Sequence, residues 1–159
     1  MKIRRILPAD NTQVRYIIQK VIMEYGAPKE GTAYSDAATQ SMYEHYQLPR
    51  RDYYVIEDAH KILGCAGVGP LENAGSSICE LQKMYFLPQA RGRGLGHKMM
   101  ELCLETARLF KYERIYIETM GNMHEAQKLY RKVGFNQLEE PIGNTGHYSC
   151  PVQMIKDLK

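Results

Sequence analysis

Long apolar runs are missing from this 159-residue sequence, and none approaches the roughly 18 residues that a helix needs to cross a bilayer. The first ten residues, MKIRRILPAD, include basic residues but no apolar stretch of the kind that secretion signals contain. We therefore expect a cytoplasmic protein with no membrane partner. Repeats, low-complexity stretches and linkers are also absent, which predicts a single domain over residues 1–159.

The excess of positive over negative charge is also small. Lys and Arg total 21 and Asp and Glu total 18, so the formal net charge is only +3. A nucleic-acid-binding protein usually carries a stronger and more clustered basic bias, so we expect no nucleic-acid partner. The cysteines form no C-x-x-C pair and have no zinc-like spacing with histidine, so we expect reduced thiols and no metal site. They are Cys65, Cys79, Cys103 and Cys150.

What the sequence does contain is ordinary for a globular protein, with 44% apolar and 25% charged residues. Apolar periodicity and capping signals predict helices over residues 11–25, 35–46, 95–110 and 124–133. Runs of β-branched and aromatic residues predict strands over residues 3–6, 53–57, 61–69, 78–87, 114–119, 135–138 and 148–155. This order indicates an α/β fold in which helices flank one central sheet.

A glycine-rich segment lies between the predicted strand 78–87 and the predicted helix 95–110. It reads R-x-x-G-x-G from Arg91 to Gly96. The unpaired amides of a helix N-terminus bind anions, and glycines let the backbone approach a phosphate closely. Neither a Walker A loop nor a Rossmann fingerprint fits, because each would need a glycine where His97 stands. The alternative interpretation is a plain strand-to-helix turn.

A second motif follows the first along the chain, A-x-x-L-Y-x-K-x-G-F from Ala126 to Phe135. The two motifs in this order resemble those of the GNAT superfamily of acyl-CoA-dependent N-acyltransferases, and the order of predicted elements resembles that family over nearly the whole chain. More narrowly, the segments ICELQKMYFLP, YIET and GNTGH are similar to the acetyltransferase half of bacterial proteins that fuse a MarR-type regulator to a GNAT domain.

The resemblance implies the GNAT fold, a central mixed and mostly antiparallel sheet with splayed fourth and fifth strands. It also implies that acetyl-CoA lays its pyrophosphate on the amides of the glycine-rich loop and its pantetheine along a bulged fourth strand. The matching loop residues are Arg91, Gly92, Arg93, Gly94, Leu95 and Gly96, and the matching strand residues are Met84 and Phe86. Many family members bind the cofactor through an Asn at the position of Met123, so the neighbouring Asn122 is the candidate here.

Acetyl transfer to an amine needs one group that accepts the amine proton and another that protonates the leaving thiolate. Glu80 lies where some GNAT enzymes have a catalytic glutamate, and its apolar neighbours would raise its pKa. Glu118 is the competing base, and a salt-bridged or solvated glutamate is the alternative interpretation of Glu80. Tyr130 matches the family tyrosine that points at the CoA sulfur, the alternative being a core tyrosine. His147, in the GNTGH segment, is expected near the acceptor.

These residues lead us to expect an N-acetyltransferase that acetylates a primary amine of a small molecule or amino acid by direct transfer in a ternary complex. The slight positive charge favours an anionic or zwitterionic acceptor over a polyamine. Four tyrosines are candidates for the acceptor wall, and a homodimer is a candidate assembly because homodimers are common in the family. The alternatives are a non-catalytic acyl-CoA-binding or sensing module and a nucleotide-binding protein. The tyrosines are Tyr25, Tyr34, Tyr43 and Tyr46.

Overall fold

The computed structural model describes residues 1–159, and one seven-stranded sheet runs through it in the order β1-β2-β3-β4-β5-β7-β6. Neighbouring strands are antiparallel except β4 and β5, which are parallel. The sheet is therefore mixed and mostly antiparallel, as the resemblance predicted. Its strands are β1 Lys2–Arg5, β2 Asp52–Asp58, β3 Lys61–Pro70, β4 Ile78–Phe86, β5 Arg114–Thr119, β6 Asn136–Leu138 and β7 Val152–Asp157.

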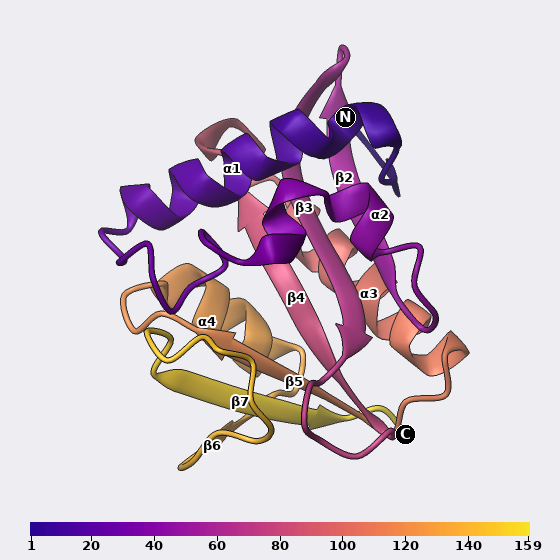
Figure 1. Cartoon of the computed structure of the whole chain (residues 1–159), viewed down its shortest axis with the longest axis vertical. Helices are drawn as coiled ribbons and strands as arrows, with labels where there is room; N and C mark the ends of the chain where they lie inside the picture. The colour runs from indigo at the N-terminus through magenta and orange to yellow at the C-terminus, as the bar shows by residue number, and fades with distance from the viewer.

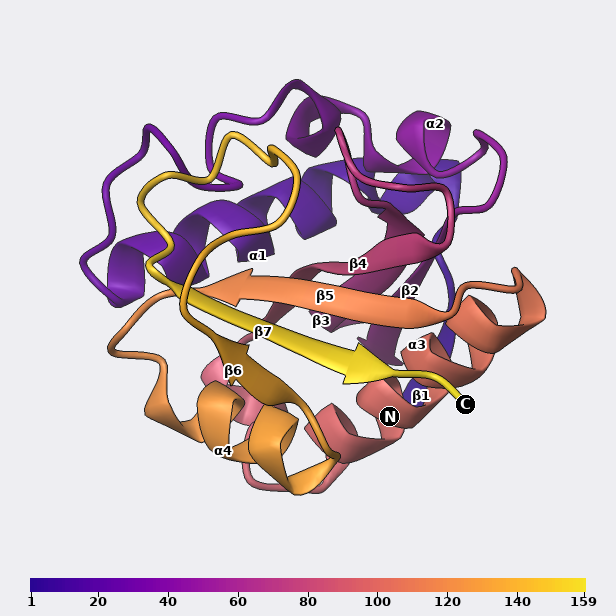
Figure 2. The ribbon, with the colours of Figure 1, turned by 90° about the horizontal axis from the view of Figure 1, so that it is seen from below.

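Helices cover both faces of this sheet (Figures 1 and 2). Figure 2 shows α1 and α2 on one side and α3 and α4 on the other, which gives three layers. Apolar residues at helical spacing in α1 and α3 are buried against the sheet, because that is how an amphipathic helix removes its apolar stripe from water. The helices are α1 Asn11–Glu24, α2 Met42–His45, α3 Leu95–Leu109 and α4 His124–Lys132. None of them is long and apolar enough to cross a bilayer.

Two segments differ from the sequence-based expectation. The helix predicted over residues 35–46 is broken into a 3-10 turn, Ala37–Gln40, and the short α2. Two hydrogen bonds to residues outside the predicted range accompany this break: the buried Thr39 hydroxyl donates to the nearby Ala33 carbonyl at 2.7 Å, and the Asn11 side chain accepts the Tyr43 amide at 2.8 Å. Helical propensity within the segment cannot report either contact.

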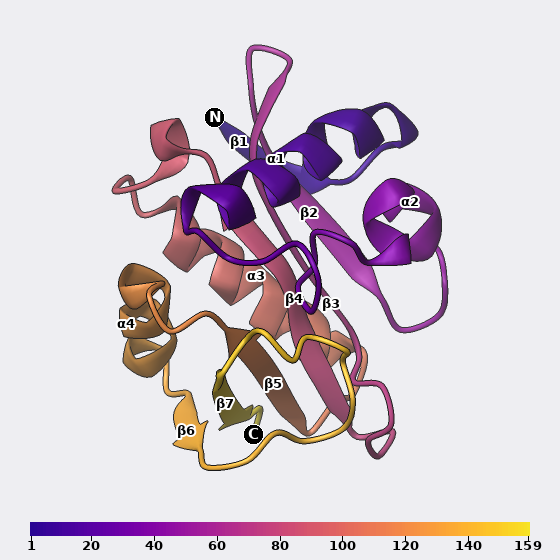
Figure 3. The same ribbon diagram turned by 60° about the vertical axis from the view of Figure 1, so that its left-hand side comes forward.

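The second difference is at the last strand, which begins at Val152 rather than at residue 148. The Ser149 amide donates instead to the Gly31 carbonyl at 3.0 Å, and the Ser149 hydroxyl donates to the Glu30 carbonyl at 3.1 Å. These bonds tie the loop before β7 to the segment between α1 and α2, and Figures 2 and 3 show the two running alongside each other. Together the two segments cover one side of the functional site described below.

The pairing between β4 and β5 is confined to one end of both strands. Ile78–Glu80 pair with Arg114–Tyr116, and beyond Glu80 the two strands separate. Figure 1 shows β4 and β5 close together near the C-terminus and diverging away from it. A bulge follows in β4, where the two residues between Gln82 and Tyr85 lie opposite the single residue between Cys65 and Gly67 on β3. Lys83, within the bulge, has a left-handed φ of +49°. The splayed fourth and fifth strands predicted from the resemblance are confirmed.

Candidate active site

A pocket of about 290 Å³ lies between the end of α1, the end of β4, the glycine-rich loop and α4. We call it the cofactor pocket. Six of the residues predicted to bind cofactor line it: Met84, Phe86, Arg91, Gly92, Gly94 and Gly96. Arg93, Leu95 and Asn122 do not line it. Its position at the start of α3 places the predicted phosphate cradle at one wall of the pocket.

The loop backbone has the geometry of an anion cradle. Gly92 and Gly94 have φ values of +68° and +72°, and no atom lies within 4 Å of where a Cβ would stand on either. The first amide of α3 to bond back along the helix is that of Lys98, which donates to the Gly94 carbonyl at 3.2 Å. The three amides before it, on residues 95–97, therefore remain available for a ligand. The open space and the free amides fit a pyrophosphate.

The Arg91 side chain forms its hydrogen bonds with other parts of the protein. Its guanidinium binds the Glu24 carboxylate with two hydrogen bonds and donates to the Phe86 carbonyl at 2.9 Å. The hydrogen bond from Arg91 lowers the pKa of Glu24. Asn122 likewise donates to the Tyr25 carbonyl at 2.8 Å. Both side chains fasten the rim of the cofactor pocket to the end of α1, and the exposed Arg93 is left without an ion pair.

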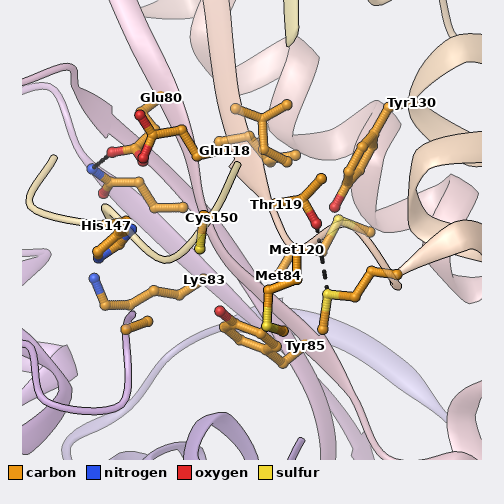
Figure 4. Close-up of a pocket in the computed structure, with 15 residues that line it drawn as sticks. Glu80, Lys83, Met84, Tyr85, Glu118, Thr119, Met120, Tyr130, His147 and Cys150 are labelled. Carbon is orange, nitrogen blue, oxygen red and sulfur yellow. Dashed lines mark hydrogen bonds between the residues drawn. The ribbon is translucent and has the colours of Figure 1, made fainter. Parts of the chain in front are cut away.

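A narrower cavity of about 40 Å³ lies where β4 and β5 separate, and we call it the slot. It shares Met84, Tyr85, Met123 and Tyr130 with the cofactor pocket. Figure 4 shows Glu80 and Glu118 at one end of the slot and Tyr130 at the other. The slot therefore brings together the two residues predicted to be catalytic.

Glu80 is buried, with only 7% of its surface exposed. Its carboxylate accepts a hydrogen bond from Gln82 Nε2 at 2.9 Å, and Gln82 Oε1 in turn accepts one from the Tyr46 hydroxyl at 2.6 Å. Burial raises the pKa of Glu80 above its ordinary value, because water no longer stabilises the ionised form. A buried carboxyl with a raised pKa is suited to proton transfer.

Glu118 has a different environment from Glu80. One of its oxygens accepts the Tyr116 hydroxyl at 2.6 Å, and the other accepts the hydroxyl of Thr145. Thr145 belongs to the loop before β7, so Glu118 also fixes that loop. Both Glu118 oxygens are thus occupied by donors, whereas Glu80 accepts from one side chain only.

Tyr130 lies on α4 and is 3% exposed. The Tyr130 hydroxyl makes no hydrogen bond with the protein. Burial of the side chain raises the pKa of Tyr130 above its ordinary value. The hydroxyl oxygen is not among the buried polar atoms that lack a partner, and the residue lines two cavities, so the hydroxyl is accessible to a ligand or to water. Tyr130 lies at the junction of the slot and the cofactor pocket, because it lines both.

A cluster of charged side chains borders the same end of the slot as Glu80. The Asp36 Oδ2 atom lies 2.7 Å from Lys83 Nζ and 2.8 Å from His147 Nε2. Burial opposes ionisation of Asp36, but its hydrogen bond with His147 and the charge of Lys83 outweigh burial and lower its pKa to about 2. Burial also opposes the charged form of His147, which by itself would lower the pKa of the imidazole. The hydrogen bond and the charge of Asp36 outweigh burial, so the pKa of His147 is raised.

Sequence reasoning singled out His147 but missed Asp36 and Lys83. Nothing in their local sequence marks these two residues, because the cluster joins the α1–α2 segment, the β4 bulge and the loop before β7. Tyr46 proved to be a buried member of the Glu80 hydrogen-bond chain, and Tyr25 lines the cofactor pocket. Tyr34 and Tyr43 line neither that pocket nor the slot.

A third cavity, of about 350 Å³, is open to solvent and lined by polar side chains together with glycines and prolines, and we call it the groove. The loop before β7 supplies most of its wall, and Glu118, His147 and Cys150 line both the groove and the slot. The three cavities therefore follow one another through shared residues, with the narrow slot in the middle.

Comparison with known proteins gives a consistent picture. The family model described as "Acetyltransferase (GNAT) family" matches residues 19–135. The Uncharacterized N-acetyltransferase YjgM of Escherichia coli strain K12 is 38% identical over 156 residues, covering 98% of this chain and 93% of that protein. A second relative, the Uncharacterized N-acetyltransferase C1271.07c of Schizosaccharomyces pombe, is 27% identical over 143 residues, covering 87% of this chain and 86% of that protein.

Solved structures share the fold at lower sequence identity. A GNAT-family acetyltransferase from Staphylococcus aureus Mu50 superposes with a TM-score of 0.83 at 17% identity, covering 99% of each chain. The yncA acetyltransferase of Salmonella typhimurium, solved with its cofactor acetyl-CoA, superposes with a TM-score of 0.80 at 19% identity, covering 100% of this chain and 94% of that one. With its anion cradle, its split sheet and these relatives, the chain belongs to the GNAT family of acetyltransferases.

Proposed function

We propose that this protein transfers the acetyl group of acetyl-CoA to the primary amine of a small molecule or amino acid, by direct transfer in a ternary complex. The observation that carries this proposal is the slot, which adjoins the cofactor pocket at one end and the polar groove at the other. Two substrates can then meet in the slot from opposite ends. No thiol acyl carrier is needed, and burial raises the pKa of Cys150, the one cysteine in the slot, to about 12.

Acetyl-CoA supplies the acetyl group as a thioester and leaves as a thiol. In the proposed step, the acceptor amine attacks in its neutral form, any ammonium proton having first gone to solvent, and Glu80 accepts a proton from it as the new C–N bond forms. Tyr130 donates its hydroxyl proton to the sulfur as the C–S bond breaks. Exchange with solvent then returns a proton to Tyr130 and removes one from Glu80. The glycine-rich loop and the free edge of β4 around Met84 hold the cofactor in register with these two groups.

The same geometry bears on the alternative of a non-catalytic acyl-CoA-binding module. Such a module needs the cofactor pocket but not a buried carboxyl and a buried phenol at opposite ends of the slot. The nucleotide-binding alternative needs only the anion cradle and would show ATP competing with acetyl-CoA. The narrower relation to GNAT domains fused with MarR-type regulators stays a prediction, as does the homodimer.

The first experiment is thermal unfolding with and without acetyl-CoA, followed by a screen for amine-dependent release of CoA. Saturation at about 100 times Kd stabilises a protein by about 2.7 kcal/mol, which raises Tm by roughly 5–10 °C at this chain length. Gly94→Asp should abolish this shift, because a carboxylate would occupy the anion cradle.

Gly26→Asp is the matched control for that experiment. Gly26 has a similar left-handed φ, +68° against +72° at Gly94, and the same open surroundings, but it does not line the cofactor pocket. It should therefore keep the acetyl-CoA shift. A folded wild-type protein that shows no shift would contradict the proposed function. A shift without CoA release for any amine would favour the non-catalytic module.

A further inference from the structure

Two basic side chains, Lys83 and His147, line the slot, and His147 also lines the groove. Lys83 reaches it from the β4 bulge with 8% of its side chain exposed, and His147 reaches it from the loop before β7 with 13% exposed. Both contact the same oxygen of Asp36, and Asp36 itself does not line the slot. Two groups that can carry positive charge therefore share one carboxylate, which lies behind them.

This arrangement leaves hydrogen-bond donors directed at no protein acceptor. Lys83 carries three N–H groups and has one protein partner, Asp36. His147 uses Nε2 for Asp36, and its Nδ1 makes no hydrogen bond with the protein. A buried ammonium is costly unless an anion or other acceptor meets it. The Asp36 carboxylate offsets part of this cost, and the bulge, with its left-handed φ at Lys83, places the ammonium in the slot wall.

The opposite charge lies at the same end of the slot. Glu80 and Glu118 both line it, and Figure 4 shows His147 between these carboxyl groups and Lys83. A polyamine would meet the Lys83 ammonium at this end, and an acceptor with anionic groups alone would meet the two carboxyl groups. A compound with an amine and an acid group close together matches both walls.

We propose that the acceptor is a zwitterion of the α-amino acid class, whose amine faces Glu80 and Glu118 and whose carboxylate is bound by Lys83 and His147. This assignment rests on the proposed function, because it places the acceptor amine beside the proton acceptor. The acceptor's side chain then lies in the groove, whose polar wall continues from His147. Lys83 and His147 are specificity-determining residues in this assignment.

The test compares the twenty common L-amino acids with their carboxamides, which keep the size and the amine but lose the acid charge. The first readout is kcat/KM from CoA release. The second is the Tm shift that each compound gives to the protein saturated with CoA, which involves no turnover. Hydrogen bonds to charged groups lead us to expect at least one amino acid preferred over its amide by roughly 10- to 100-fold in kcat/KM.

Lys83→Met should remove most of this preference by lowering kcat/KM for the amino acid and leaving that for the amide nearly unchanged. Lys111→Met is the matched control, because Lys111 is also a lysine at left-handed φ (+60°) but is exposed and outside the three cavities. His147→Gln is the second variant, in case Lys83→Met does not fold. It keeps a donor for Asp36 and should reduce the preference in the same direction.

The outcomes separate this inference from the proposed function. Amides acetylated as well as their acids, with a ratio that Lys83→Met leaves unchanged, would overturn the zwitterion assignment while the acetyltransferase proposal stands. Amino acids that shift Tm more than their amides do, yet release no CoA, would support the assignment and contradict the proposed catalysis. If no amino acid is acetylated or shifts Tm, the assignment is wrong, and the acetyl-CoA shift alone then decides the cofactor proposal.

Discussion

At the scale of single residues, the site contains two buried side chains with ionisable groups, Glu80 and Tyr130. Glu80 is a buried carboxyl with a raised pKa, and Tyr130 is a buried phenol without a protein partner. Groups of this kind are common at functional sites because the chemistry requires them in a state that the fold alone would not favour. Replacing either one should therefore separate activity from stability.

Glu80→Gln should lower kcat by about 10²- to 10⁴-fold, since a general base is worth that much. The Tm shift caused by acetyl-CoA should not change, because Glu80 does not line the cofactor pocket. In the wild type, kcat/KM should rise with pH through an apparent pKa above the ordinary value for Glu, and Glu80→Gln should lack this limb. Glu118→Gln is the comparison, and a larger rate loss there would move the base to Glu118.

Glu80→Gln, which should lower activity, should raise stability at neutral pH. A carboxyl whose folded pKa is raised contributes stability at low pH, and that contribution is lost as pH rises through the folded pKa. Glu80 is therefore a cost near neutral pH. Glu80→Gln should raise Tm at pH 7 relative to the wild type, and the difference should shrink toward pH 4. A lower Tm at pH 7 would show that the carboxylate is stabilised when ionised.

Tyr130→Phe should lower kcat by about 10²-fold while the Kd for acetyl-CoA and the Tm change little. The reason is that the Tyr130 hydroxyl makes no hydrogen bond that folding would lose. Tyr112→Phe gives the contrasting result, because its hydroxyl donates to the Arg50 carbonyl at 3.0 Å. That control should lose about 1 kcal/mol of stability and keep its activity. Full activity in Tyr130→Phe would assign protonation of the sulfur to another donor.

At the scale of elements, sequence periodicity predicted most helices and strands to within a few residues. The long amphipathic α1 and α3 were predictable because their apolar spacing repeats over several turns. The break in the helix predicted over 35–46 was not predictable, because it depends on bonds from Thr39 to Ala33, just before that range, and from Tyr43 to the distant Asn11. Turn chemistry alone could not predict it.

Asn11→Ala should destabilise the protein by about 1–2 kcal/mol in denaturant unfolding. The Asn11 side chain accepts the Tyr43 amide at the start of α2 and donates to Glu44 Oε2, each at 2.8 Å. Removing it leaves the first turn of α2 without its cap. Asn136→Ala, at an exposed position on the edge strand β6, is the control and should change stability by far less. Equal losses would show that the cap contributes nothing specific.

At the scale of the whole molecule, the site is made where segments distant along the chain meet. The two GNAT-like motifs could be identified from the sequence because each lies within one short stretch. The structure brings Gly92, Gly94 and Tyr130, which belong to these motifs, to one pocket. The Asp36 cluster and the pairing of Arg91 with Glu24 could not be predicted from the sequence, since each joins residues that only the tertiary fold makes neighbours. The sequence predicts the chemistry of the cofactor better than the specificity for the acceptor.

Asp36→Asn tests this long-range cluster. A carboxyl whose pKa is lowered from 3.8 to about 2 contributes stability above its ordinary pKa, about 2 kcal/mol near neutral pH. That stability is lost as pH falls from about 4 to 2. The variant should therefore unfold more easily at pH 7, and the difference should narrow in acid. Asp58→Asn removes an exposed ion pair with the N-terminus and should change stability by less than about 1 kcal/mol.

The slot has two mouths, and this has a kinetic consequence. Because the cofactor pocket and the groove adjoin the slot from different ends, we expect CoA and the acetylated product of the proposed reaction to leave by separate routes. Free CoA then competes with acetyl-CoA for one mouth but does not obstruct the acceptor at the other. Product inhibition by CoA should accordingly be competitive against acetyl-CoA and noncompetitive against the acceptor. Neither substrate has to wait for the other, so the split in the sheet permits binding in either order.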